Sequence, residues 1–107
     1  MKSFVWLSFD LGVKGDYEGM YTWLAKRGAK ECGDSIACFW YEHSGDLRQQ
    51  IKDDLDASLD LDRQKNRVYL IWKQNKKTKG SFIFGHRRVA PWASYAETGE
   101  QVDDAGS

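Results

Sequence analysis

The chain has 107 residues, the size of a single domain, and its 16 Lys and Arg residues balance its 16 Asp and Glu residues. This balance excludes an overall field that would draw the protein to nucleic acid or to a membrane, so any such attraction has to be local. No apolar run approaches the ~18 residues of a transmembrane helix, and the first apolar run is too brief for a signal peptide. We therefore expect a cytoplasmic protein with no membrane partner.

The first element is predicted to be a strand that ends at Asp10. The run Phe4–Phe9 is apolar and has no helical spacing, a pattern typical of a strand buried on both faces. Two glycines then allow the chain to turn into a helix over residues 16–27. In this helix Asp16 is a suitable N-cap, and an apolar face is formed by Tyr17, Met20, Tyr21 and Leu24.

A hairpin is predicted next, with the pair Gly33-Asp34 as its turn. Its second strand, residues 35–41, is apolar, which indicates a central strand. Its first strand, residues 29–32, is short and polar, which indicates an edge.

This hairpin register also predicts where the cysteines point. Cys32 would face Ser35 and Cys38 would face Ala29, so the two thiols would lie on opposite faces of the sheet. The spacing of the cysteines is not a zinc signature either. We expect free thiols in a reducing compartment.

The second half of the chain predicts another helix and two more strands. Asp46 and Gln49 have the spacing of a variant capping box, and the helix that follows has an apolar face made by Leu47, Ile51, Leu55 and Leu59. Strands are predicted over residues 67–72 and 81–84, joined by the lysine-rich segment 73–80.

The elements therefore follow the order strand, helix, strand, strand, helix, strand, with one added strand at the end. This order predicts the α+β arrangement called split βαβ or ferredoxin-like, an antiparallel sheet of order 4-1-3-2 with both helices on one face. We assign residues 1–95 to this domain. Residues 96–107 are acidic and lack apolar periodicity, so we expect a disordered tail there.

The uncovered face of such a sheet keeps aromatic side chains, whichever way its inner strands point. An open aromatic face serves as a subunit interface, is covered by another segment such as residues 90–95, or stacks bases. All three interpretations are open at this stage. RNA-recognition domains stack bases on the same two strands, but residues 34–41 do not match their motif.

The clearest electrostatic feature is the segment 73–88, which holds six Lys or Arg residues, one His and no acid. Such a segment can neutralise several phosphates, which makes it a candidate nucleic-acid site. The alternative is a hairpin whose lysines keep an exposed edge from pairing. The candidate binding residues are Lys73, Lys76, Lys77, Lys79, His86, Arg87 and Arg88.

Asp10 is the candidate catalytic residue. A carboxylate at a strand end can hold a hard cation such as Mg²⁺, and a symmetric dimer would bring two copies of it together. The alternative is an Asp that caps the turn or the following helix. His43 and His86 are not part of a recognisable nucleophile–base arrangement in the sequence, and Ser8, Ser44 and Ser81 do not stand in a nucleophile-elbow motif, so we expect no catalytic triad.

The run Ser8-Phe9-Asp10-Leu11, the order of elements over residues 3–86 and the short fifth strand resemble a group of small ferredoxin-like proteins. The group includes the nuclease-like subunit of CRISPR adaptation complexes and the VapD endoribonucleases. The resemblance implies that Asp10 is a catalytic or metal-binding residue and that two copies form a symmetric dimer. In that dimer residues 81–84 would pair with the partner's sheet. The loop 73–80 and residues 91–95 have no counterpart in the group.

These observations favour a small homodimer that binds RNA or DNA through residues 73–88, without catalysis and without a cofactor. One alternative is a Mg²⁺-dependent endoribonuclease that uses Asp10. The other is a protein-interaction module of the antitoxin or inhibitor type, which would have a protein partner.

Overall fold

Five strands and two helices form residues 1–96, the part of the chain that the computed structural model describes. The elements are β1 (Lys2–Asp10), α1 (Tyr17–Lys26), β2 (Lys30–Gly33), β3 (Ile36–Glu42), α2 (Leu47–Ser58), β4 (Arg67–Gln74) and β5 (Lys77–Phe84). The strands form one antiparallel sheet in the order β2-β3-β1-β4-β5. The predicted α+β class is confirmed. Apart from Ala96, the predicted tail 96–107 lies outside the described residues.

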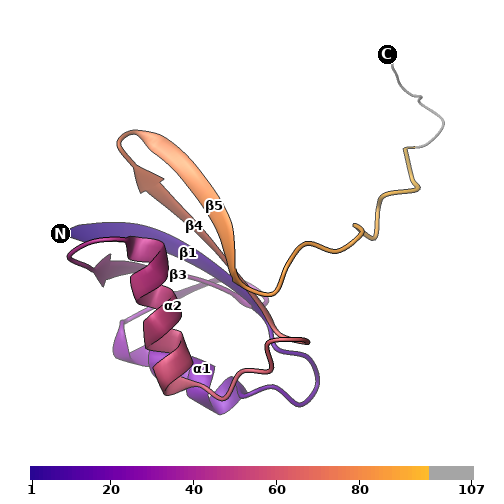
Figure 1. Cartoon of the computed structure of the whole chain (residues 1–107), viewed down its shortest axis with the longest axis horizontal. Coiled ribbons are helices and arrows are strands. Elements are labelled where there is room, and N and C mark those ends of the chain that lie inside the picture. The colour runs from indigo at the N-terminus through magenta and orange to yellow at the C-terminus, as the bar shows by residue number, and fades with distance from the viewer. Residues whose placement is uncertain (97–107) are drawn as a thin grey trace.

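Both helices lie on one side of the sheet (Figure 1). Along β1, Val5, Leu7 and Phe9 are buried beneath them, whereas Trp6 is half-buried and Ser8 is exposed. The prediction that this strand is buried on both faces is therefore wrong, because only one face is covered. The core between the sheet and the helices also contains residues of both helices and of β3 and β4: Met20, Leu24, Ala37, Phe39, Ile51, Leu55, Val68 and Leu70.

The two predicted N-caps are confirmed. The Asp16 carboxylate accepts a hydrogen bond from the Gly19 backbone N–H at 2.9 Å, and the Asp46 carboxylate accepts one from Gln49 N–H at 3.2 Å. Each bond satisfies a donor that the first turn of a helix leaves without an intrahelical partner. Asp16 also accepts from the Asp60 N–H at 2.9 Å, which joins the start of α1 to the chain after α2.

A polar cluster joins the two helices at the edge of the core. Arg27 and Asp54 form an ion pair, and the Arg27 guanidinium lies 3.7 Å from the centre of the Trp23 ring. The Asp54 carboxylate also accepts hydrogen bonds from the Trp23 indole at 3.2 Å and from the Tyr41 hydroxyl at 3.3 Å. One carboxylate on α2 thereby ties together α1 and β3.

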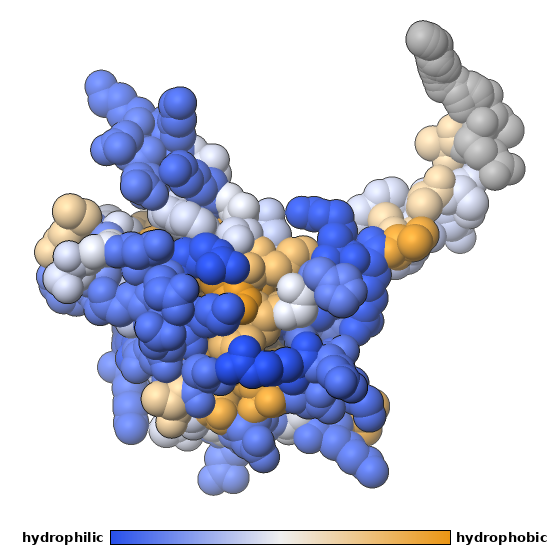
Figure 2. Space-filling view, in the orientation of Figure 1, coloured by the Kyte–Doolittle hydropathy of each residue, from blue (hydrophilic) through white to orange (hydrophobic). Residues whose placement is uncertain are grey.

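The β4–β5 hairpin is longer than the sequence indicated. The segment 73–80, predicted to be a loop, belongs to the two strands except for a two-residue turn, Asn75-Lys76. Both turn residues have positive φ angles, 53° and 68°, and two such residues match the twist of a tight hairpin. The hairpin tip projects past the rest of the sheet (Figure 1) and is hydrophilic (Figure 2).

The β2–β3 hairpin turns one residue later than predicted, at Asp34-Ser35. Gly33 pairs with Ile36, and the register shifts between Glu31 and Gly33, as in a β-bulge. Because the bulge adds a residue on one strand, Cys32 changes face. The prediction that Cys32 and Cys38 point to opposite faces is wrong: their Sγ atoms lie 2.9 Å apart.

The segment after β5 leaves the body of the molecule (Figures 1 and 2). The Trp92 and Tyr95 side chains on it are 71% and 85% exposed, so residues 90–95 do not cover the open face of the sheet. Of the three uses considered for that face, two are left. Among residues 1–96, no helix has the length and apolar character needed to cross a membrane.

Candidate nucleic-acid interface

The open face of the sheet is formed by the side chains that alternate with the core residues of each strand. On β3, Trp40 is 60% exposed and Ile36 is 37% exposed. Phe39, which points to the opposite face of the sheet, is buried. On β1, Phe4 makes edge-to-face contacts with Trp6 and with Trp40, at centroid distances of 4.9 and 5.1 Å. An aromatic surface therefore runs across β1 and β3, two of the three inner strands.

Beside these aromatic residues the open face holds a shallow pocket of about 350 Å³. Three strands contribute to it, because β1, β4 and β5 are neighbours in the sheet. The segment that follows β5 adds an arginine. The lining residues are Ser8, Asp10, Arg67, Tyr69, Phe82 and Arg87.

Two aromatic rings form the floor of this pocket. Tyr69 and Phe82 are paired across β4 and β5, and their rings meet edge to face with centroids 4.8 Å apart. Gly80 makes room for the Tyr69 ring, because a Cβ atom at this position would lie 2.4 Å from the Tyr69 hydroxyl oxygen. The absence of a side chain at residue 80 thus sets where the ring lies.

Two arginines lie against these rings. The Arg87 guanidinium is 5.9 Å from the centre of the Tyr69 ring and 5.6 Å from that of Phe82. The Arg67 guanidinium lies 6.0 Å from the Phe82 centre. Contacts of this kind attract a cation to the π face, and an arginine held there keeps its planar donors for a phosphate or carboxylate.

Asp10 lies in the same pocket and faces Arg67 across the β1–β4 ladder. Its Oδ2 atom is 3.5 Å from an Arg67 nitrogen, and its Oδ1 atom accepts from the Gly12 N–H at 3.2 Å. The Asp10 carboxylate therefore holds the turn that follows β1 and offsets part of the positive charge of Arg67. Among residues 1–96 there is no group of three His, Cys, Asp or Glu side chains placed to hold a metal ion.

The structure separates the basic residues predicted to bind nucleic acid. Lys76 lies in the hairpin turn and Lys73 on the open face beside it, whereas strand alternation puts Lys77 and Lys79 on the side of the helices. The residues that follow β5, His86–Arg88, lie at the other end of an eight-residue strand, roughly 25 Å from the tip. Of the seven, only Arg87 lines the pocket.

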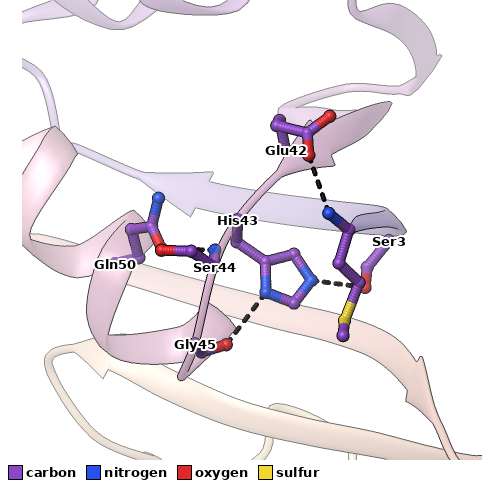
Figure 3. A network of polar contacts seen from close by, with 7 residues as sticks. Ser3, Glu42, His43, Ser44, Gly45 and Gln50 are labelled. Carbon is purple, nitrogen blue, oxygen red and sulfur yellow. Dashed lines mark hydrogen bonds and ion pairs between the residues drawn. The ribbon is translucent and has the colours of Figure 1, made fainter.

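A second polar cluster lies at the far end of β1, around His43 (Figure 3). This buried ring contacts the Gly45 carbonyl oxygen through Nδ1 at 2.9 Å and the Ser3 hydroxyl through Nε2 at 2.8 Å. A carbonyl only accepts, so in the neutral ring Nδ1 carries the hydrogen and Ser3 donates to Nε2. The third group is a carbonyl, not the carboxylate of a triad, and the cluster joins β1 to the loop before α2.

Sequence reasoning named Asp10 and Arg87 of the pocket but not Arg67 or Tyr69. These two residues belong to an apolar run that reads as an ordinary strand. Comparisons of the chain with protein-family models, with curated proteins and with solved structures found no match. The resemblance to CRISPR and VapD proteins therefore stays a prediction, and the site is interpreted from its geometry.

Proposed function

We propose that this protein binds single-stranded nucleic acid on the open face of a ferredoxin-like sheet, without catalysing a reaction. The observation that carries the proposal is the pairing of two arginines with two aromatic rings in one open pocket. Unpaired bases expose a π face that stacks on such rings, and the adjacent phosphates bind the guanidinium groups. Bases inside a duplex are already stacked, so a single strand is favoured.

The charge distribution supports a local contact. The whole chain has a formal net charge of zero, so binding has to arise where cations gather near π faces. Lys73 on β4 extends the positive charge along the open face, and the exposed Trp40 ring offers a further stacking surface on β3. The bound strand would then run from the pocket across the inner strands.

The alternative function, a metal-dependent nuclease, has less support from this geometry. Asp10 is 52% exposed at its side chain, but it faces Arg67 rather than a second carboxylate. A divalent cation at Asp10 would have to lie beside that guanidinium, and this repulsion disfavours the metal. A second copy of the chain would be needed to supply further ligands.

We also propose that the protein is a homodimer, as the resemblance implies. β5 is one of the two edge strands of the sheet, so another strand could pair with its outer side, and the Phe82 carbonyl oxygen of β5 would have to keep or exchange the hydrogen bond that it accepts from Arg48 at 2.8 Å. Pairing of two copies at this edge would leave the open face accessible. It would also place two pockets near one another across the dimer axis.

The experiment is a fluorescence-anisotropy titration of short single-stranded RNA and DNA oligonucleotides with the full chain. We expect binding at ~50 mM salt that weakens steeply towards ~200 mM, because phosphate contacts release counterions. Tyr69→Leu and Phe82→Leu remove one π face each and should weaken binding by about 1–3 kcal/mol. Absence of binding at the lower salt concentration would overturn the proposal.

Arg87→Gln and Arg63→Gln form a matched pair for the charge contribution. Both remove one positive charge next to a phenylalanine ring: Arg87 lies 5.6 Å from Phe82 on the open face, and Arg63 lies 5.5 Å from Phe84 on the covered side. We expect Arg87→Gln alone to weaken binding and to lower its salt dependence. Cleavage of the oligonucleotides that requires Mg²⁺ and is lost in Asp10→Asn would instead favour the metal-dependent nuclease function.

A further inference from the structure

The two cysteines of the chain lie side by side at the β2 edge of the sheet. Their Sγ atoms are 2.9 Å apart, although six positions separate them in the sequence. Cys32 is exposed and Cys38 is half-buried, so the two sulfur atoms differ in how easily a reagent reaches them. Nothing in the proposed binding of nucleic acid uses either thiol.

The backbone of the hairpin holds this arrangement. Cys38 pairs with Lys30 across the ladder, and the bulge between Glu31 and Gly33 turns Cys32 towards it. Gly33 has a φ of 140° and Ser35 a φ of 61°, conformations that fix the tight end of the hairpin. The thiols are therefore brought together by the fold of β2 and β3, not by chance contact of flexible side chains.

We propose that Cys32 and Cys38 are a thiol–disulfide exchange site that closes into an intrachain disulfide when the chain meets a small-molecule disulfide of the glutathione class. The Cys32 thiolate attacks one sulfur of the small disulfide, which forms a mixed disulfide and releases one thiolate. The Cys38 thiolate then attacks Cys32 Sγ, which closes the protein disulfide and releases the second thiolate. The protein loses two protons and two electrons, and the small disulfide gains them.

The exposures assign the order of these two steps. Cys32 attacks the small disulfide first, because it is the more accessible sulfur of the pair. Cys38 is already within reach of the Cys32 sulfur and resolves the mixed disulfide. The site responds to the ratio of disulfide to thiol around the protein, and the ratio at which it closes is set by the reduction potential of the cysteine pair.

The experiment incubates the reduced full chain with mixtures of reduced and oxidised glutathione, followed by acid quenching and intact-mass spectrometry. We expect the wild-type chain to lose two hydrogens and both free thiols, with no lasting glutathione adduct. Cys38→Ser should accumulate one adduct, at Cys32, because its resolving thiol is gone. Cys32→Ser should form far less adduct, since Cys38 is less exposed. Circular dichroism confirms that both variants fold.

A comparison with the unfolded chain tests whether the fold creates the site. The wild-type chain in strong denaturant keeps the same sequence separation but loses the hairpin register. We expect ring closure from the mixed disulfide to be roughly tenfold faster or more in the folded chain, because the reacting sulfurs are held together. Equal closure in both states, a persistent wild-type adduct, or disulfide-linked dimers as the main product would overturn the proposal.

Discussion

The two faces of the sheet are built from alternating residues of the same strands, yet they differ in nearly every physical property. On the covered face, Val5, Leu7 and Leu70 are fully buried beneath two helices. On the open face, the neighbouring aromatic, aliphatic and polar side chains are half-buried or exposed. The difference indicates that stability and binding can be changed separately, one residue apart along a strand.

Leu70 and Ile71 on β4 give the sharpest test of this division, and the largest expected effect. Leu70 is fully buried, so Leu70→Ala should lower the free energy of unfolding by about 2–5 kcal/mol through lost burial and a cavity. Ile71 is 37% exposed on the open face, so Ile71→Ala should cost less, about 1–2 kcal/mol. Urea unfolding followed by circular dichroism measures both.

Similar costs for the two β4 variants would show that the open face is covered as well, for instance by a second copy of the chain. In that case the cost of Ile71→Ala should depend on protein concentration, because dissociation would be linked to unfolding. The same titration therefore separates an open face that stays accessible from one that a second copy of the chain covers.

Gly80→Ala tests whether a change on the open face lowers oligonucleotide binding without lowering stability. The added Cβ atom would come within 2.4 Å of the Tyr69 hydroxyl oxygen, so the ring has to leave its position on the pocket floor. We expect oligonucleotide affinity to fall about tenfold, as expected when one stacking contact is lost. The free energy of unfolding should change by less than about 1 kcal/mol, because residue 80 lies outside the core.

Gly45→Ala is the matched control, because a Cβ atom there meets nothing within 4 Å and its φ is not positive. Both variants make the same chemical change. If Gly80→Ala binds as tightly as Gly45→Ala while Tyr69→Leu loses affinity, the exact position of the Tyr69 ring does not matter. The pocket would then act through the presence of an aromatic ring alone.

The sequence predicted the helices and strands far better than it predicted the turns and the β-bulge that set how the strands pair. Helix caps such as Asp16 and Asp46 are local signals, set by a side chain and a backbone group three residues away. The turn Asn75-Lys76 was missed because a lysine with positive φ carries no signal in the sequence. The bulge before Gly33 was missed for a similar reason, and with it the contact between the two thiols.

The candidate site was only partly visible in the sequence because its parts come from three strands. Asp10 and Arg87 stood out as charged residues beside apolar runs. Arg67 and Tyr69 did not, since their partners are fixed by the register of β4 against β1 and β5. Register between distant segments depends on packing of the whole sheet, which no short motif records.

The smallest expected effect lies on the covered side and depends on pH. Burial raises the pKa of Tyr41 to about 12 from an ordinary value of 10.0, and the nearby Asp54 carboxylate adds to the shift while Arg27 opposes it. The fold therefore favours the neutral phenol. Its contribution to stability is fully present below pH 10 and is lost as the pH rises from there towards 12.

Tyr41→Phe removes this ionisation while keeping the ring that packs against Trp23 and Phe39. Below pH 10 the variant should be slightly less stable than wild type, because Asp54 loses the hydrogen bond from the Tyr41 hydroxyl at 3.3 Å. Above that pH the difference should shrink and then reverse, since only the wild type has a buried phenol to ionise. Urea unfolding of both chains across this pH range measures the difference, and parallel curves would show that Tyr41 ionises as readily in the folded chain as in the unfolded one.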